Sequence, residues 1–200
     1  MKKILINFAH PAKSNSRINN TLLKAIEGLD NVTINDLYAH YPDFIIDVER
    51  EQHLCAINDI IIFQHPFYWY SNPSIMNEWM ELVLKHGWAY GSEQNALKGK
   101  HWMQAISTGV DNKSYQKKGS VGYTINEFLT PFKATANLCQ MINLPPFMVM
   151  GANDGLSHED INDYAQNYRR VLIALKDETI DLKKILGLTF MNDILSLLKK

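Results

Sequence analysis

Short apolar runs alternate along this chain with longer segments in which apolar residues recur every three or four positions. The runs are rich in β-branched residues and lack a strict apolar–polar alternation, as residues 60–63 show with the sequence IIIF. Such runs are typical of strands that a parallel sheet buries on both faces. Strands are therefore predicted at residues 3–9, 31–38, 59–64, 101–107 and 147–150.

The intervening segments have the period of amphipathic helices. Ile18, Leu22 and Ile26 form one apolar stripe, and Ser14 or Asn15 is the candidate N-cap of that helix. Strands that alternate with helices in this way predict a three-layer α/β sandwich on a five-stranded parallel sheet. Helices are predicted at residues 15–29, 48–56, 73–87, 123–141 (interrupted at Pro131) and 157–175.

Residues 177–200 exceed what five strand–helix units require. Their apolar residues lie four apart, which predicts an additional amphipathic helix. We therefore divide the chain into an α/β domain of residues 1–176 and a C-terminal helical extension of residues 177–200. The extension packs on its own domain, on a partner subunit or on another protein, and the first two options are favoured. The stripe consists of Leu182, Leu186, Phe190, Ile194 and Leu198.

The chain has 200 residues, of which 46% are hydrophobic, enough for the core of one ordinary domain. Twenty Lys and Arg residues against 21 Asp and Glu residues leave a net charge of −1. This balance disfavours nucleic acid and anionic membrane surfaces as partners. The two cysteines, Cys55 and Cys139, are too few for a disulfide scaffold, so a cytoplasmic location is expected. No apolar run has the length of a membrane span, so no integral membrane protein is expected.

Polar residues follow the first and third predicted strands, which would flank the ligand-binding crevice if the strand order is 2-1-3-4-5. The first loop carries His10, Ser14, Ser16 and Asn19 around a helix N-terminus. Hydroxyl and backbone N–H groups at such a terminus can hold a phosphate. Neither glycine fingerprint of nucleotide triphosphate or dinucleotide binding is present. An ordinary polar loop with helix caps is the alternative interpretation.

Four consecutive aromatic residues, 67–70, follow the third predicted strand. A core cannot easily bury all four, and aromatic walls with backbone donors and acceptors suit a flat heteroaromatic ring such as a flavin. A protein–protein contact surface is the alternative. After the fourth strand, Ser107, Thr108 and Gly109 offer hydroxyls and a close backbone approach to a ligand.

Other chemistries lack their motifs in this sequence. The seven histidines show no metal-ligand spacing, so no metal site is expected. No acidic pair follows the first strand, which disfavours a phospho-acceptor receiver domain. No G-x-S-x-G elbow supports an α/β-hydrolase.

Taken together, these loops resemble the flavodoxin-like NAD(P)H:quinone oxidoreductase family. Within that family, the chain is similar to the ancillary proteins of glutathione-regulated potassium-efflux systems. The likeness extends over about residues 3–175 and leaves the tail of the chain outside. It rests on seven motifs in order: 9–11 (AHP), 64–66 (QHP), 69–71 (WYS), 86–91 (HGWAYG), 99–101 (GKH), 108–109 (TG) and 144–147 (LPPF).

The resemblance implies a flavodoxin-like fold with strand order 2-1-3-4-5 and a homodimeric flavoprotein. It also implies FMN, or FAD in its place, as the cofactor, NADPH or NADH as the electron donor, and a quinone or similar small molecule as the acceptor. By position, the residues around the flavin would be His10, Ser16, Ile18, Asn19, Pro66, Phe67, Tyr68, Trp69, Tyr70, Ser107, Thr108, Gly109 and Tyr115.

Two tyrosines are the candidate catalytic residues under this resemblance. Tyr115, with backbone N–H groups near Trp69, would stabilise negative charge on the reduced ring, and Tyr90 would face the substrate pocket from the other subunit. Mammalian quinone reductases of the family have a glycine and a histidine where this chain has Val110 and Val121. A proton relay through that histidine is therefore not carried over to this chain.

The leading hypothesis is a two-electron, ping-pong oxidoreductase in which donor and acceptor use the same face of the flavin. The alternative from another class is a regulatory subunit of a potassium-efflux transporter, peripheral at the inner face of the membrane, with the C-terminal extension as a docking surface. A flavodoxin that carries single electrons is disfavoured, because such carriers are usually strongly acidic and this chain is nearly neutral.

Overall fold

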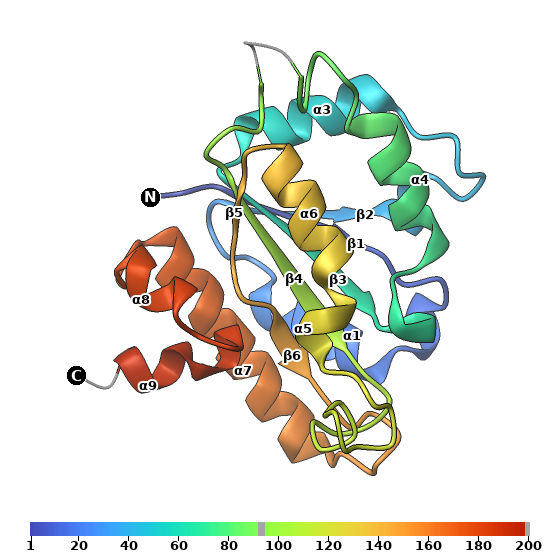
Figure 1. Ribbon diagram of the computed structural model, residues 1–200, viewed down its shortest axis with the longest axis vertical. Helices are drawn as coiled ribbons and strands as arrows, with labels where there is room; N and C mark the ends of the chain where they lie inside the picture. The colour runs from blue at the N-terminus through green and yellow to red at the C-terminus, as the bar shows by residue number, and fades with distance from the viewer. Residues whose placement is uncertain (92–94, 199–200) are drawn as a thin grey trace.

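A computed structural model describes residues 1–91 and 95–198 of the chain (Figure 1). Its centre is a parallel sheet in the order β2-β1-β3-β4-β5, and β6 pairs with β4 further along the same edge. The predicted flavodoxin-like topology is therefore confirmed. The strands are β1 (Ile4–Phe8), β2 (Val32–Asp36), β3 (Ile60–Pro66), β4 (His101–Ser107), β5 (Ile142–Asn143) and β6 (Phe147–Val149).

The central strands β1, β3 and β4 are buried along their whole length, as their mostly apolar runs predict, and their few polar residues are buried with them. Successive side chains enter opposite cores, with Ile4 and Ile6 of β1 in one core and Leu5 in the other. Ile60 of β3 pairs with Ile4 of β1 and with His101 of β4. The strands thus run in parallel register, and their carboxyl ends meet at one edge of the sheet.

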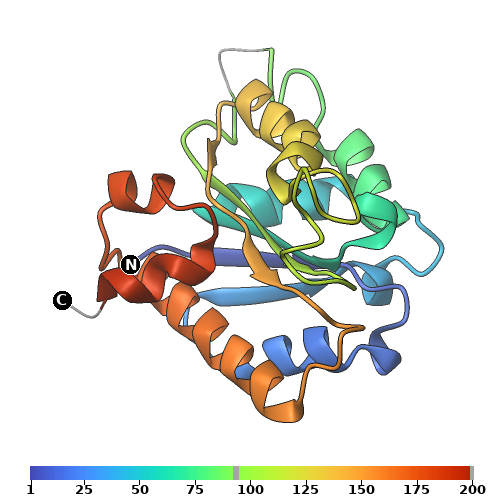
Figure 2. The ribbon, with the colours of Figure 1, turned by 60° about the horizontal axis from the view of Figure 1, so that its bottom comes forward.

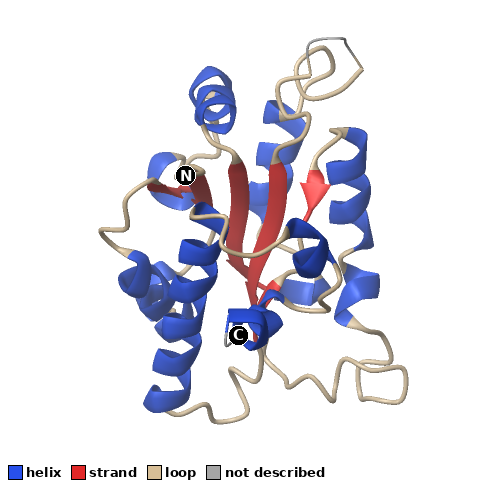
Figure 3. Ribbon diagram, turned by 90° about the vertical axis from the view of Figure 1, so that its left-hand side faces the viewer, coloured by secondary structure: helices blue, strands red, loops and turns tan. Residues whose placement is uncertain are grey.

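Helices cover both faces of the sheet, and Figures 2 and 3 show the strands between the two layers. One face carries α1 (Arg17–Ile26) and α7 (His158–Lys176), which pack side by side. The other face carries α3 (Val48–Ile57), α4 (Ser74–Val83), α5 (Ile125–Phe128) and α6 (Thr130–Leu138).

The start of α1 differs from its predicted start. Ser14 and Asn15, the candidate caps, belong to a short 3-10 helix, η1 (Lys13–Asn15). The actual N-cap is Ser16, whose Oγ accepts a hydrogen bond from the Asn19 N–H at 3.3 Å. The correction places the Ser16 hydroxyl and the first free N–H groups of α1 at the carboxyl edge of the sheet.

Three other elements differ from prediction at their ends. Asp36 caps a short helix, α2 (Leu37–His40), which ends the second strand earlier than expected. The break between α5 and α6 falls at Leu129, so that Pro131 stands in the first turn of α6, where proline is tolerated. Helix α4 ends one turn before Gly87.

The fifth strand is interrupted. Residues 144–146 separate β5 from β6 and include Pro145 and Pro146, which have no N–H group for the ladder. Pairing with β4 therefore stops after β5 and resumes at Phe147. The predicted strand at 147–150 corresponds to β6.

The C-terminal extension is not the single helix that its four-residue spacing predicts. It forms three short pieces: α8 (Leu182–Leu186), η3 (Met191–Ile194) and α9 (Leu195–Leu198). Helix α8 ends at Gly187, which has poor helix propensity. The chain then turns back toward the sheet before the next piece begins.

The buried side chains of the extension also differ from the predicted stripe. Ile185, Met191 and Ile194 are buried in the core that α1 and α7 share, and of these only Ile194 belongs to the stripe. Leu186 is 46% exposed, and the side chain of Leu198 lies outside the described part of the structure. Within the described chain, the extension packs on its own domain, the first of its three expected partners.

Candidate functional site

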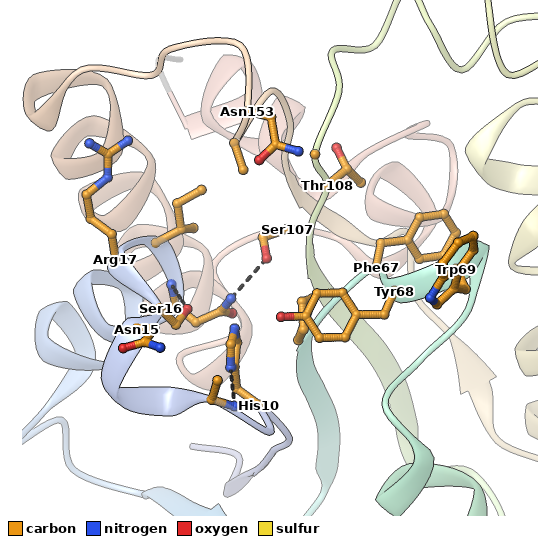
Figure 4. Close-up of a pocket in the computed structure, with 16 residues that line it drawn as sticks. His10, Asn15, Ser16, Arg17, Phe67, Tyr68, Trp69, Ser107, Thr108 and Asn153 are labelled. Carbon is orange, nitrogen blue, oxygen red and sulfur yellow. Dashed lines mark hydrogen bonds between the residues drawn. The ribbon is translucent and has the colours of Figure 1, made fainter.

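The carboxyl ends of β1, β3, β4 and β6 meet at a cavity of about 530 Å³ (Figure 4). This volume is in the range of pockets for small organic ligands. Its walls are the loops that follow these strands, where the sequence places the crevice. Of the predicted flavin residues, the cavity brings together His10, Ser16, Ile18, Asn19, Pro66, Phe67, Tyr68, Trp69, Ser107, Thr108 and Gly109.

One end of the cavity is the N-terminus of α1. The N–H groups of Arg17 and Ile18 stand in the first turn, where the helix offers no backbone acceptor. They combine with the Ser16 hydroxyl and the positive end of the helix dipole. Among the described residues that line the cavity, Arg17 is the only Lys or Arg, and its Nη2 donates to the Leu156 carbonyl at 2.8 Å. This end of the cavity suits a phosphate.

His10 lies beside this helix end. Its Nδ1 accepts the Ala12 N–H at 3.1 Å, so a neutral ring carries its proton on Nε2 and can donate from there. Burial lowers the pKa of His10, which keeps the ring neutral near pH 7. The Tyr68 ring lies edge-on to it, with centroids 6.0 Å apart. His10 can therefore serve as a neutral hydrogen-bond donor to an anion.

A buried polar network fixes α1 against the ends of β3 and β4. The Asn19 Nδ2 donates to the Ser107 Oγ at 2.9 Å, and the Gln64 Nε2 donates to the Asn19 carbonyl at 3.2 Å. All three side chains are buried, where hydrogen bonds are strong and restrict movement. The Gln64 Oε1 has no hydrogen-bond partner among the described residues. The Gln64 Oε1 is thus a buried acceptor that could still take a hydrogen bond.

The opposite end of the cavity is the aromatic loop, which contains the 3-10 helix η2 (Tyr68–Tyr70). Trp69 and Tyr70 have φ values of 50° and 62°, in the left-handed region that such residues rarely adopt. Trp69 is 93% exposed, whereas Phe67 is buried. Figure 4 shows the Tyr68 ring directed toward His10 and Trp69 at the outer side of the loop. Backbone strain of this kind clusters at ligand sites.

Two predicted flavin residues lie behind this aromatic wall. Tyr70 stacks on Phe128, with centroids 5.1 Å apart, and lines an adjoining cavity of about 370 Å³. Tyr115 is buried between Phe67 and Phe128, with centroids 6.0 and 6.3 Å away. Burial raises the pKa of Tyr115, so the phenol keeps its proton at neutral pH. Tyr115 therefore supports the wall and does not line the main cavity.

Tyr90 is not brought to the cavity within the chain. It belongs to the connection between α4 and β4, which lies at the opposite edge of the sheet (Figure 1). Its carbonyl accepts the Gly87 N–H at 2.8 Å, and its ring packs edge-on against His86. A role beside the flavin therefore requires Tyr90 from another copy of the chain.

Some residues that line the cavity are absent from the sequence prediction: Ala12, Asn15, Arg17, Ala152 and Asn153. Ala152 and Asn153 follow β6. Every other wall of the cavity is also a loop that follows a strand, so the predicted end of this strand could have pointed to them. The Asn153 Nδ2 lies 2.8 Å from where a Cβ at Gly109 would stand. Glycine at position 109 therefore permits the close approach of these two walls.

The described residues contain no helix long and apolar enough to cross a membrane. They also contain no group of three or more His, Cys, Asp or Glu side chains that could hold a metal ion. The two histidines at the ends of β1 and β3, His10 and His65, are buried apart from each other in separate hydrogen-bond environments.

The fold and the cavity at its carboxyl edge define an α/β protein of the flavodoxin type. The sequence profile of the Flavodoxin-like fold family matches residues 2–172, and the chain belongs to this family. General stress protein 14 of Bacillus subtilis is 46% identical over 164 residues, which are 82% of this chain and 93% of that protein. A glutathione-regulated potassium-efflux system ancillary protein of Pectobacterium atrosepticum is 45% identical over 150 residues, 75% of this chain and 82% of that protein.

Solved structures agree with this assignment. The crystal structure of general stress protein 14 from Treponema denticola in complex with FMN has a TM-score of 0.82 and 36% identity, and covers 86% of this chain and 99% of its own. An NADPH-quinone reductase from P. pentosaceus has a TM-score of 0.77 and 33% identity, with 84% and 96% covered. The family expected from the loop motifs is thus confirmed.

Proposed function

We propose that the protein is an FMN-dependent NAD(P)H:quinone oxidoreductase that transfers two electrons by a ping-pong mechanism. The observation that carries this proposal is a single cavity with a helix N-terminus at one end and an aromatic loop at the other. FMN has a phosphate at one end and a flat ring at the other, so it matches both. The similar structures that bind FMN and that are named NADPH-quinone reductase support the same assignment.

The lining residues fit the two ends of FMN. The phosphate would accept hydrogen bonds from the Ser16 hydroxyl, the N–H groups of Arg17 and Ile18, and the His10 Nε2–H, with Asn19 holding the helix in place. The ring would lie between the loops after β3 and β4, against Pro66, Phe67, Tyr68, Trp69, Ser107, Thr108 and Gly109.

When bound, the flavin supplies the redox chemistry: it accepts two electrons from a nicotinamide and passes them to a quinone. The chain orients the ring and supplies hydrogen-bond donors. The N–H groups of Trp69 and Tyr70 would donate to the edge of the ring where negative charge develops. Tyr115 keeps its proton behind the aromatic wall, because burial raises its pKa. Donor and acceptor would stack in turn on one open face of the ring, which gives ping-pong kinetics.

The test is to purify the protein, add FMN and record the visible spectrum and the acceptor-dependent oxidation of NADPH and NADH. We expect a flavin spectrum and parallel lines in double-reciprocal plots of initial rate. A protein that neither contains nor takes up flavin would refute the proposal, and intersecting lines would refute the ping-pong order. Mass spectrometry of the released cofactor distinguishes FMN from FAD.

We further propose a homodimer in which Tyr90 of one subunit completes the acceptor pocket of the other. The aromatic residues near the cavity are well exposed and support a contact surface for a second subunit there. They are Tyr68, Trp69, Tyr70 and Tyr123. Tyr90→Ala should raise the KM for quinone without lowering FMN affinity. In mixed dimers of a Tyr90→Ala subunit and a Trp69→Ala subunit, whose own FMN binding is weakened, the site in the Tyr90→Ala subunit receives an intact Tyr90 and should regain the wild-type KM. A fully active protein that light scattering shows to be monomeric would contradict this arrangement.

A regulatory subunit of a glutathione-gated potassium-efflux transporter is the second candidate function. The 45% identity to an ancillary protein of such a system favours it, and it would place the protein in the cytoplasm at the inner face of the membrane. The test is co-purification with the transporter from the same organism, together with potassium efflux in a deletion strain. No co-purification and unchanged efflux would contradict this role, which is compatible with the enzymatic one.

A further inference from the structure

The C-terminal extension contacts the sheet at its edge strand. Strand β6 pairs with β4 on one side, and in the described part of the chain no strand pairs with its other side. An edge of this kind leaves backbone N–H and C=O groups without partners. The extension lies outside residues 2–172, which the family profile matches.

Asn192 occupies the place that a neighbouring strand would take. Its Oδ1 accepts the Met148 N–H at 2.9 Å, and its Nδ2 donates to the Met148 carbonyl at 2.8 Å. The N–H of Met191 donates to the Pro146 carbonyl at 2.8 Å. One side chain and one backbone group thus satisfy three backbone groups along the open edge of β6.

Apolar contacts hold Asn192 in this place. Met191 and Ile194, on either side of it in sequence, are fully buried in the same core as Phe147 of β6 and Tyr168 of α7. Detaching the Asn192 amide from β6 would therefore expose apolar surface as well as break hydrogen bonds. The contact is an integral part of the folded domain.

Strand β6 leads directly into a wall of the cavity. The N–H groups of Gly151, Ala152 and Asn153 donate to the carbonyls of Val110, Thr108 and Gly109 at 3.1, 2.9 and 2.8 Å. Ala152 and Asn153 line the cavity together with Thr108 and Gly109. The position of β6 therefore determines where this wall stands.

We propose that Asn192 is a positioning residue for the FMN site: it holds the open edge of β6 and, through β6, the wall formed by residues 151–153. The proposal rests on the proposed FMN-binding function. Without the Asn192 amide, the Met148 N–H and C=O lose their partners, and the folded ensemble includes states in which β6 and the wall are displaced. FMN then binds only the ordered fraction, so its apparent affinity falls in proportion.

The test compares Asn192→Leu with the wild-type chain by FMN fluorescence quenching and by amide hydrogen exchange of residues 147–153. We expect the FMN dissociation constant to rise about tenfold and exchange in this segment of the FMN-free protein to accelerate. Asn192→Asp keeps the acceptor for the Met148 N–H but turns a carboxylate oxygen toward the Met148 carbonyl, so at neutral pH it should weaken FMN binding at least as much as Asn192→Leu. If Asn192→Leu does not fold, Asn192→Asp is compared with the wild-type chain in its place.

Two controls separate positioning from general stability. Ser196→Ala removes a hydrogen bond within the extension, from the Ser196 Oγ to the Asp193 carbonyl, and should leave FMN affinity unchanged. Cys55→Ala in α3 leaves a space in the core remote from β6, so it should lower Tm with little change in FMN affinity. If wild-type protein binds no FMN, the proposed function fails. If wild type binds FMN and both Asn192 variants bind it within twofold, the positioning role is overturned.

Discussion

Trp69 and Tyr70 hold two consecutive left-handed backbone conformations. For residues with a side chain, each costs about 1–2 kcal/mol. Burial of the indole offsets little of this cost, because Trp69 is 93% exposed. Neighbouring contacts, such as the stacking of Tyr70 on Phe128, have to maintain the conformation. The strained backbone therefore does not serve to bury the Trp69 side chain. It sets the path of the loop along the cavity.

We predict that Trp69→Gly and Trp69→Ala have the same effect on FMN binding and different effects on stability. Both remove the ring from the proposed cofactor wall, so both should weaken FMN binding. Glycine adopts a left-handed φ freely, whereas alanine keeps the strain, so the glycine variant should be more stable by about 1 kcal/mol. Urea unfolding of the FMN-free proteins measures this difference. Equal stabilities would show that the left-handed turn is not strained.

We predict that Arg17→Gln weakens binding of FMN about tenfold and leaves riboflavin binding unchanged, because an Arg–phosphate interaction contributes on the order of 1.4 kcal/mol. Arg17 belongs to the phosphate end of the cavity, its guanidinium donates to the Leu156 carbonyl, and riboflavin has no phosphate. Titration of each ligand by fluorescence at two salt concentrations is the measurement. Lys24→Gln, on the exposed face of the same helix, is the matched control, and an equal loss there would point to a general charge effect.

Sequence alone identifies most of the cavity because its residues follow apolar strands whose ends are easy to place. His10 and the aromatic loop fall into this group. Arg17 and Asn153 could not be predicted in the same way. Arg17 depends on the direction in which α1 leaves its cap at Ser16, and Asn153 depends on where the interrupted fifth strand ends.

Helix α3 is joined to its neighbours through a fully buried carboxylate, Glu51. Its oxygens accept hydrogen bonds from the Trp79 Nε1 at 2.8 Å, the Asn35 Nδ2 at 2.8 Å and the Tyr41 hydroxyl at 2.7 Å. Arg50 pairs with the same group from the partly exposed side. One side chain thus connects α3 to α4, to β2 and to the loop after α2.

We predict that Glu51→Ala destabilises the protein by about 3–5 kcal/mol, because it leaves several buried donors without an acceptor. Glu51→Gln keeps one acceptor and should cost about 1–3 kcal/mol. Urea denaturation gives both values. Glu49→Gln, at an exposed position of the same helix, should change the free energy of unfolding by less than about 0.5 kcal/mol. A small effect of Glu51→Ala would mean that water replaces the carboxylate.

The strands and most helices could be predicted because their apolar patterns reflect burial by the sheet. The extension shows the limit of that reasoning. Leu182, Leu186 and Phe190 satisfy a helical period, but the period does not say which surface the segment meets. Helix α8 ends at Gly187, and the Met191 N–H binds the Pro146 carbonyl just before β6. Both features depend on the tertiary structure of the folded domain.

The molecule as a whole holds several histidines in neutral form. Burial lowers the pKa of His10, His65 and His101. In the unfolded chain these rings titrate near the ordinary value of about 6.5. Between the two pKa values the unfolded chain binds more protons than the folded one, so stability is complete above about pH 6.5 and falls as the pH decreases.

We predict that Tm is lower at about pH 5.5 than at about pH 7.5, and that His65→Gln reduces this difference. His65 is fully buried, and the amide of glutamine can replace its hydrogen bond to Gln104 without titrating. Differential scanning calorimetry at both pH values is the measurement. His53→Gln, at an exposed position, should leave the pH dependence as in wild type. A Tm that rises on acidification would contradict the expected effect of these buried rings.

The walls of the cavity come from residues 10–19, 66–69, 107–109 and 152–153, which lie far apart along the sequence. A growing chain on the ribosome therefore has no complete cavity until the last of these segments has been made. A ligand captured at that point stabilises every earlier strand through the shared sheet, by an amount set by its concentration relative to its dissociation constant. If the cavity takes the proposed FMN, the supply of FMN during synthesis would therefore set how much of the newly made chain persists in folded form.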